Sequence, residues 1–303
     1  MNPKLSLYAD AQLRSISYKT NGINSDLNPF LINDDFTFFN PKLGLNYQFN
    51  EENSLYASFA RANREPNRTD YENGSPKPEQ LNDFELGWRL KKEDLIINAN
   101  AYYMGYNDQL VLTGAIDDVG APIRANSGKS YRLGIEVDAN IKISEYLSVL
   151  PNISVSSNKN IDFTRTLNGE LVDLGNTNIS FSPNLIFGNA LVFRASKNIK
   201  MSLLSKFVGE QFMGNVDSEF SKLDSYFVND FNLSYLINTN SIFKSITLTA
   251  LVNNIYNVEY VSNGYFYTYE DTWTAPGESL TMEGAGYYPQ ATTNFLLGVT
   301  FKF

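Results

Sequence analysis

Cysteine and histidine are both absent from this chain of 303 residues. Without cysteine there is no disulfide, no thiolate metal site and no cysteine nucleophile. Without histidine the chain lacks the commonest general base and metal ligand, and a Ser-His-Asp triad is excluded. We therefore expect no catalytic residue, no metal site, no cofactor and no enzymatic activity. An enzyme based on carboxylates or lysine stays the weakest alternative, because nothing selects a pair from the 33 acidic residues.

An excess of basic residues is also missing. The 24 Lys and Arg residues are outnumbered by 33 Asp and Glu residues, which gives a net charge of −9. A nucleic-acid-binding protein needs a basic face, so we expect no nucleic-acid partner. No window approaches the ~18 consecutive apolar residues of a membrane helix. The first residues also lack the charged and then apolar pattern of a signal peptide, so none is expected.

Aromatic residues are abundant, at 14% of a chain whose mean hydropathy is only −0.28. They fall in segments where apolar and polar residues alternate with a period of two. In 131–141, for example, Leu133 and Ile135 lie on one face, while Arg132 and Glu136 lie on the other. This period is typical of a β-strand with one apolar and one polar face. We expect about 12 such strands, beginning near residues 4, 39, 54, 82, 95, 130, 146, 181, 199, 223, 244 and 288.

The connections between these strands alternate in length. Short turns are expected at 50–53, 91–94, 143–146, 196–198 and 238–243, and long polar loops near 19–37, 62–81, 107–128, 158–180, 209–222 and 256–287. All short turns then fall at the end of the sheet where the last residue lies. Tight turns at one edge and long loops at the other are typical of an outer-membrane β-barrel.

A soluble β-sandwich also has alternating strands and is the main alternative. Three features weigh against it, the first being that a sandwich has no reason to place all its long loops at one edge. Several strands run for nine or more residues, close to the ~9–11 that cross a bilayer when tilted. Aromatic residues also gather at the ends of the apolar faces, where the two interfacial girdles of a barrel lie. The expected fold is therefore an all-β antiparallel transmembrane β-barrel.

Particular segments carry a family likeness. They are NPKLGLNYQF (40–49), SLYASFARANREPNR (54–68), PEQLNDFELGW (78–88), residues 107–136, VGEQFMGN (208–215), DSYFVNDFNLSY (224–235), VNNIYNVEY (252–260) and FLLGVTFKF (295–303). The chain resembles the C-terminal half of the barrel of a TonB-dependent outer-membrane receptor from about residue 4 to its end. The Asn-Asn element at 253–260 is the most diagnostic of these segments, whereas a terminal Phe fits any outer-membrane barrel.

The resemblance implies a barrel of about 22 strands that is closed by an N-terminal plug domain. Such receptors import scarce, bulky nutrients with energy delivered through TonB. We expect residues 1–303 to be one partial barrel domain in the bacterial outer membrane, without a plug or a signal peptide, and with unpaired edges at its first strand and at 291–303. The implied partners are the plug domain, the N-terminal barrel strands, the TonB complex, and outer-membrane lipid and lipopolysaccharide.

The leading interpretation of function is active, TonB-energised uptake of a ferric siderophore-type ligand. Oligosaccharide uptake is the alternative within the family, and no residue separates the two. A free-standing barrel of about 12 strands, acting as a passive porin or adhesin, is the alternative outside it.

Candidate site residues fall into two groups. Aromatic and arginine side chains of the external loops are expected to contact a ligand. They have alternative roles in packing the loops, in pairing with loop carboxylates or in binding lipopolysaccharide. Charged residues on the polar faces of strands are expected to face the lumen and meet a plug. The loop residues are Arg64, Arg68, Tyr71, Arg124, Tyr265, Tyr267, Tyr269 and Trp273, and the lumen residues are Arg14, Arg89, Arg132, Glu136 and Asp138.

Overall fold

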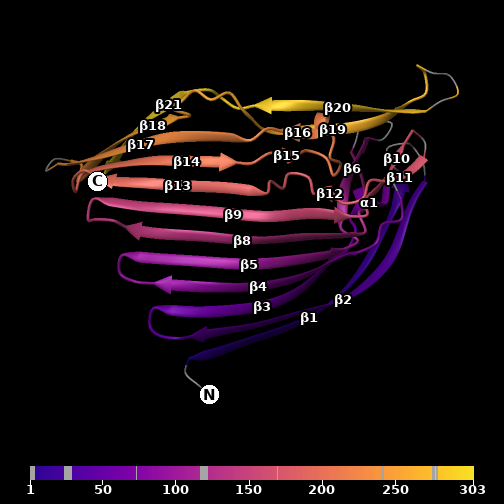
Figure 1. The fold of residues 1–303 in the computed structure, drawn as a ribbon, viewed down its shortest axis with the longest axis horizontal. Helices are drawn as coiled ribbons and strands as arrows, with labels where there is room; N and C mark the ends of the chain where they lie inside the picture. The colour runs from indigo at the N-terminus through magenta and orange to yellow at the C-terminus, as the bar shows by residue number, and fades with distance from the viewer. Residues whose placement is uncertain are drawn as a thin grey trace.

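One large antiparallel sheet dominates the computed structural model, which describes residues 4–23, 29–72, 74–116, 122–168, 170–239, 242–274, 277 and 279–303. Neighbouring strands along the chain pair with one another throughout this sheet (Figure 1). The predicted all-β antiparallel class is confirmed. In spatial order the strands are β1 (Leu5–Ile23), β2 (Pro29–Gln48), β3 (Asn53–Arg64), β4 (Glu79–Lys91), β5 (Leu95–Asn107), β8 (Lys129–Lys142), β9 (Leu147–Ile161), β13 (Leu185–Arg194), β14 (Ile199–Val208), β17 (Tyr226–Asn238), β18 (Ser245–Asn253) and β21 (Asn294–Lys302).

The register gives this sheet one apolar and one polar face. Ile135 is aligned with Ala101 of β5 and with Val155 of β9, whereas Glu136 is aligned with Asn100 and Ser154. The apolar face is not covered by other parts of the chain: Leu7 is 74% exposed and Leu297 is 77% exposed. Exposure of so many large apolar side chains on one surface is unlike a soluble protein and indicates an apolar environment.

Short turns connect the strands at one end of the sheet, on the left in Figure 1, where β1 begins and β21 ends. Single side chains close several of them. Asn50 Oδ1 accepts hydrogen bonds from the backbone N–H groups of Glu52 and Asn53. Ser144 Oγ accepts from Tyr146 and Leu147 in the same way, and Ser196 Oγ accepts from Asn198 and Ile199. Asn and Ser stabilise tight turns by such bonds, so these turns form locally.

The opposite end carries a second layer of structure, which we call the crown. The sequence predicted long polar loops here, but most of their length is paired backbone, because the hairpins satisfy their own hydrogen bonds and pack on one another. Residues 24–28, 73, 117–121, 169, 275, 276 and 278 of those predicted loops lie outside the described residues, as do residues 240 and 241 of the predicted short turn 238–243. The crown contains α1 (Arg68–Glu72), β6 (Leu110–Ile116), β7 (Pro122–Asn126), β10 (Thr164–Leu167), β11 (Glu170–Asp173), β12 (Thr177–Asn178), β15 (Gln211–Phe212), η1 (Glu219–Ser221), β16 (Lys222–Leu223), β19 (Val261–Asp271) and β20 (Leu280–Pro289).

The predicted loops at 19–37 and 256–287 differ most from expectation. β1 and β2 stay paired out to Ile23 and Pro29, so they form one long hairpin. β19 and β20 form a second hairpin, which joins β6 and β7 in a four-stranded sheet. The apolar core of the crown consists of Val111, Phe163 and Val216, with Leu174 and Phe266 packed against it.

The segment at 253–260 makes the junction between β18 and the β19–β20 hairpin. Asn254 and Asn257 adopt positive φ angles of 50° and 55°, a conformation that Asn tolerates better than most residues. The Asn254 side chain accepts from the N–H of Val258 at 2.9 Å and donates to its carbonyl at 2.7 Å. The backbone carbonyl of Asn254 accepts from Thr293 Oγ1 at 2.6 Å, which ties this bend to the start of β21.

The sheet is not closed. Within the described residues β1 pairs only with β2, and β21 pairs only with β18, as the sequence predicted for these edges. The same residues contain no helix that is long and apolar enough to cross a membrane. Two strand edges therefore keep backbone groups available for pairing with further strands.

Candidate ligand-binding site

Two clefts open on the polar face of the sheet, at its crown end. The larger has a volume of about 950 Å³ and lies over β14 and β17, below the base of the β19–β20 hairpin. Hydroxyl, amide and charged groups share its wall with aromatic rings, a mixture that suits binding of an amphiphilic molecule. Its lining residues are Phe181, Leu204, Ser205, Lys206, Gln211, Tyr226, Val228, Asp230, Tyr260, Ser262, Asn263 and Gln290.

The smaller cleft has a volume of about 300 Å³ and lies over β4, β5, β8 and β9. Arg132 crosses its wall and donates a hydrogen bond from Nη1 to Ser182 Oγ at 2.7 Å. Glu136 accepts from Ser154 Oγ at 3.4 Å. Phe181 lines both clefts, so the two openings meet at this ring. The pair of clefts offers polar and aromatic groups to a ligand.

The segment 179–183 positions Phe181. Ile179 is 3% exposed and anchors the segment, while the Phe181 ring is 42% exposed. The backbone N–H of Phe181 donates to the carbonyl of Phe212 at 2.8 Å. Ser180 donates its N–H to Asn215 Oδ1 at 3.1 Å. The segment is therefore held from the 211–222 part of the crown and from Arg132 of β8.

Asn215 is the centre of a buried polar network that joins three connections of the crown. Its side chain is 1% exposed, and its Nδ2 donates to the carbonyl of Leu112 at 2.8 Å. Its Oδ1 accepts from Ser180 and, at 3.4 Å, from Asn160 Nδ2. Its backbone carbonyl accepts from Thr177 Oγ1 at 2.8 Å. Because these bonds reach the connections 107–128 and 158–180 from the connection 209–222, they brace the crown above the clefts.

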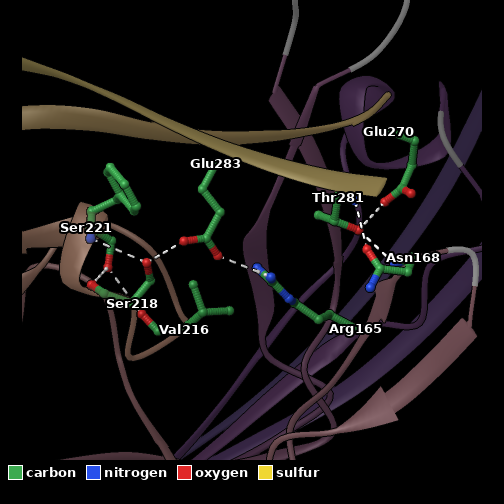
Figure 2. Close-up of polar contacts among 9 residues, drawn as sticks. Arg165, Asn168, Val216, Ser218, Ser221, Glu270, Thr281 and Glu283 are labelled. Carbon is green, nitrogen blue, oxygen red and sulfur yellow. Dashed lines mark hydrogen bonds and ion pairs between the residues drawn. The ribbon is translucent and has the colours of Figure 1, made fainter. Parts of the chain in front are cut away.

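A second set of polar contacts ties the β10–β11 hairpin to β20. Figure 2 shows Glu283 between Arg165 and Ser218: Arg165 Nη2 lies 3.1 Å from Glu283 Oε1, and Ser218 Oγ donates to the other carboxylate oxygen. The two side chains of the ion pair are only 11% and 22% exposed. Farther along β20, Thr281 exchanges hydrogen bonds with Asn168 and donates to Glu270.

The predicted aromatic residues of β19 lie on the face opposite this ion pair. Tyr265, Tyr267 and Tyr269 form a row whose ring centroids are 6.2 and 6.4 Å apart. The rings of Tyr265 and Tyr267 lie over Gly286 and Gly284 of β20, where an added Cβ would come within 2.3 and 2.5 Å of them. None of the three lines either cleft. Trp273, near the tip, is 90% exposed.

The other predicted crown residues also lie away from the clefts. Arg64 pairs with Glu79 at 3.1 Å and Arg68 pairs with Glu72 at 3.0 Å, so both contact loop carboxylates. Tyr71 donates its hydroxyl to Asp34 at 2.6 Å; burial and the Asp34 carboxylate raise the pKa of this tyrosine above its ordinary value. Arg124 lies on β7 and lines neither cleft.

The five residues predicted for the lumen all lie on the polar face of the sheet, by the strand register. Only Arg132 and Glu136 line a cleft. Arg14 pairs with Glu65, and Arg89 lies 4.6 Å from the centroid of the Tyr56 ring. Asp138 accepts from Asn98 Nδ2 at 2.9 Å. Ligand or plug contact by any of these residues stays a prediction.

Sequence reasoning missed Phe181, Asn215, Arg165 and Glu283. Their positions depend on contacts between segments far apart in the chain, such as the pair Arg165–Glu283 across 118 residues. The dipeptide Ser182-Pro183, which favours a turn, was the one local signal near Phe181. Among the described residues no three carboxylates lie close enough to hold a metal ion.

Comparison with known proteins gives one family. The sequence model described as "TonB dependent receptor-like, beta-barrel" matches residues 2–255. No curated protein matches the chain in sequence.

Solved structures show the same fold. The copper transporter OprC has a TM-score of 0.74 and 18% identity, and the match covers 100% of this chain and 46% of that one. The siderophore receptor PiuA from Acinetobacter baumannii has a TM-score of 0.70 and 15% identity, over 99% of this chain and 41% of that one. The ferric yersiniabactin uptake receptor FyuA from Yersinia pestis has a TM-score of 0.68 and 14% identity, over 100% of this chain and 44% of that one. The chain therefore spans less than half the length of the receptors that it matches.

Proposed function

This chain belongs to the TonB-dependent receptors, and we propose that it supplies the C-terminal part of the barrel of an outer-membrane receptor for TonB-energised uptake of a bulky, scarce nutrient. The observation that carries the proposal is the pair of clefts on the polar face, which lie beneath a crown with its own packed core. In this assignment the apolar face contacts lipid and the polar face lines the lumen. No covalent step is part of the function.

The open edges of the sheet support the proposed partners. An unpaired strand edge in hydrocarbon leaves backbone groups without hydrogen bonds, at a cost of several kcal/mol for each group. We therefore propose that β1 and β21 pair with further strands of the same receptor. A plug domain then contacts the charged residues of the polar face, and TonB acts through that plug. Residues 1–303 form a single partial barrel domain in this arrangement.

The proposed ligand is a ferric siderophore-type chelate. Two structural neighbours are described as siderophore or ferric-chelate receptors, although at 14–15% identity they support the fold alone. The larger cleft adds an argument from this chain, because Lys206 places a cation on its wall, which also carries Asp230; in the smaller cleft Arg132 lies with Glu85 and Glu136. Lys206 makes no ion pair or hydrogen bond with any residue in the described ranges, so its charge is available to an anionic ligand.

Growth under iron limitation tests this proposal. A strain that carries the gene for the full-length receptor is expected to take up a radiolabelled ferric chelate, and to lose that uptake when the gene or tonB is deleted. Uptake that continues without TonB would contradict active transport. Growth dependence on an oligosaccharide, without uptake of any ferric chelate, would assign the receptor to the alternative ligand class.

Refolding separates the receptor from a passive porin. Residues 1–303 alone, added to lipid, are expected to form no stable channel, because two edges remain unpaired. Addition of the N-terminal half, with its plug and strands, is expected to give a heat-modifiable barrel. Stable conductance from residues 1–303 as a monomer would instead show a small free-standing porin.

A further inference from the structure

Phe181 has an unusual backbone conformation. Six residues other than glycine have positive φ angles in the described part of the chain, and five of them are Asp or Asn. Phe181, with φ of 50°, is the sixth. Asp and Asn tolerate this left-handed region because their short side chains form local hydrogen bonds, whereas a bulky residue does so only when its surroundings hold it there.

The surroundings of Phe181 do hold it there. Its own N–H donates to the carbonyl of Phe212 at 2.8 Å. The preceding residue, Ser180, donates to Asn215 Oδ1, and the following residue, Ser182, accepts from Arg132. Ser182 Oγ also donates to the carbonyl of Ser180 at 2.9 Å, which closes the turn around Phe181. Two separate segments, 211–222 and β8, together with a bond inside the turn, therefore fix a backbone conformation that phenylalanine disfavours.

The fold does not use this ring to build a core. Ile179, two residues before Phe181, and Met213, which follows its partner Phe212, are each only 3% exposed. The Phe181 ring is instead 42% exposed and lines both clefts. Strained residues that persist in folded proteins cluster at functional sites, where the strain holds a group in its working position. An exposed ring held by strain at the meeting point of two clefts fits that description.

The larger cleft contains the other groups that a flat ligand needs. Tyr226 and Tyr260 lie in its wall, with ring centroids 4.5 Å apart. Lys206 lines the same cleft, as does Asp230, and Lys206 makes no hydrogen bond or ion pair with any described residue. Aromatic rings attract other aromatic rings in offset or edge-to-face arrangements, and an ammonium group attracts phenolate or carboxylate oxygen.

We propose that Phe181 is a specificity-determining residue that stacks against an aryl group of the transported chelate, and that Lys206 pairs with that group's anionic oxygens. This inference rests on the proposed function and narrows it to chelates that carry aromatic rings. Aliphatic chelates of the same charge and size lack the π-surface that Phe181 offers, so they gain nothing from the ring.

The experiment measures affinity of the purified full-length receptor for two probes, a ferric tris-catecholate and an aliphatic ferric trihydroxamate. Phe181→Ala is expected to raise the Kd of the catecholate about 3- to 10-fold, as loss of one aromatic pair predicts, and to change the Kd of the trihydroxamate less than about twofold. Phe181→Gly removes the backbone strain together with the ring and is expected to give the same selective loss. The matched control is Phe220→Ala, because Phe220 is 62% exposed on η1 and lines neither cleft.

The outcomes separate this inference from the proposed function. Unchanged catecholate affinity in Phe181→Ala, or an equal loss for both probes, would overturn the role of Phe181 while uptake of ferric chelates stands. A receptor that binds only the trihydroxamate would also overturn the role of Phe181 and leave uptake of ferric chelates standing. A receptor that binds neither probe would overturn the siderophore ligand and this inference together.

Discussion

The barrel sheet and the crown place their apolar side chains in opposite ways. Along the sheet, large side chains such as Leu7 and Leu297 are more than 70% exposed on one face. In the crown, Val216 and Phe163 are 3% and 4% exposed in a small core of their own. In the proposed outer-membrane barrel, lipid replaces a protein core for the sheet, whereas the crown stands in water and has to bury its apolar side chains. One chain thus has two arrangements of apolar side chains, and one junction between them is the bend at Asn254, between β18 and the β19–β20 hairpin.

The largest expected effect comes from a charge on the apolar face. Ile135→Arg places a guanidinium near the middle of β8, and at the bilayer midplane such a substitution costs about 2–4 kcal/mol. Ser154→Arg puts the same side chain on the polar face of β9, beside Glu136, and is expected to fold normally. The measurement is the fraction of heat-modifiable receptor after refolding into lipid vesicles. Equal yields for the two variants would show that the apolar face does not contact lipid.

Sequence alone predicted the sheet well and the crown poorly, and the contrast has a physical cause. The alternation around Ile135 is a local property, so strands, faces and short turns can be read from neighbouring residues. The four-stranded sheet of the crown depends on contact between Thr268 and Ala115, which no local pattern encodes. The predicted ligand residues illustrate the limit: Tyr265, Tyr267 and Tyr269 were expected in a long loop, which the structure shows as the β19–β20 hairpin. Their side chains lie on the face of this hairpin opposite Glu283 and line neither cleft.

Within the crown, the pair Arg165–Glu283 is expected to give the next largest effect. Glu283→Leu leaves the guanidinium of Arg165 mostly buried and without its partner, which should cost about 2 kcal/mol of local stability. The double variant Arg165→Met with Glu283→Leu removes both charges and should recover most of that loss. Hydrogen–deuterium exchange of the β10–β11 and β19–β20 hairpins is the measurement. Exchange in the strands of the large sheet should stay unchanged. If the hairpins of the double variant exchange as fast as those of the single variant, the unpaired Arg165 is not the cause of the loss.

A smaller effect is expected at the boundary between the two regions. Asn254→Ala removes the hydrogen bonds to Val258 and strains a position with φ of 50°, at a cost of about 1–2 kcal/mol. Asn254→Gly keeps the conformation accessible and loses only the side-chain bonds. The melting temperature of the receptor in detergent should therefore fall more for alanine than for glycine. The reverse order would show that the bend does not depend on the left-handed backbone.

The smallest effect concerns pH at the tip of the β19–β20 hairpin. The side chain of Thr274 and the N–H groups of Thr274 and Trp273 hydrogen-bond to Asp271 and lower the pKa of this carboxyl below its ordinary value of 3.8. Because the pKa is lower in the folded state, the ionised carboxylate stabilises the turn at any pH above the ordinary pKa. This stabilisation is lost as the pH falls through the pKa of the folded state. Trp273 fluorescence should therefore change only below about pH 4, and Asp271→Asn should abolish the change. A transition near neutral pH would contradict this assignment.

Spin labels along β8 test the central assignment of faces most directly. Single labels at positions 131 to 139 of the full-length receptor in lipid bilayers report accessibility to oxygen, which concentrates in hydrocarbon. We predict a period of two, with maxima at Tyr131, Leu133, Ile135 and Val137 and minima at Arg132, Glu136 and Asp138. Uniform accessibility along the strand, or maxima at the charged positions, would contradict a barrel whose apolar face contacts lipid and whose polar face lines the lumen.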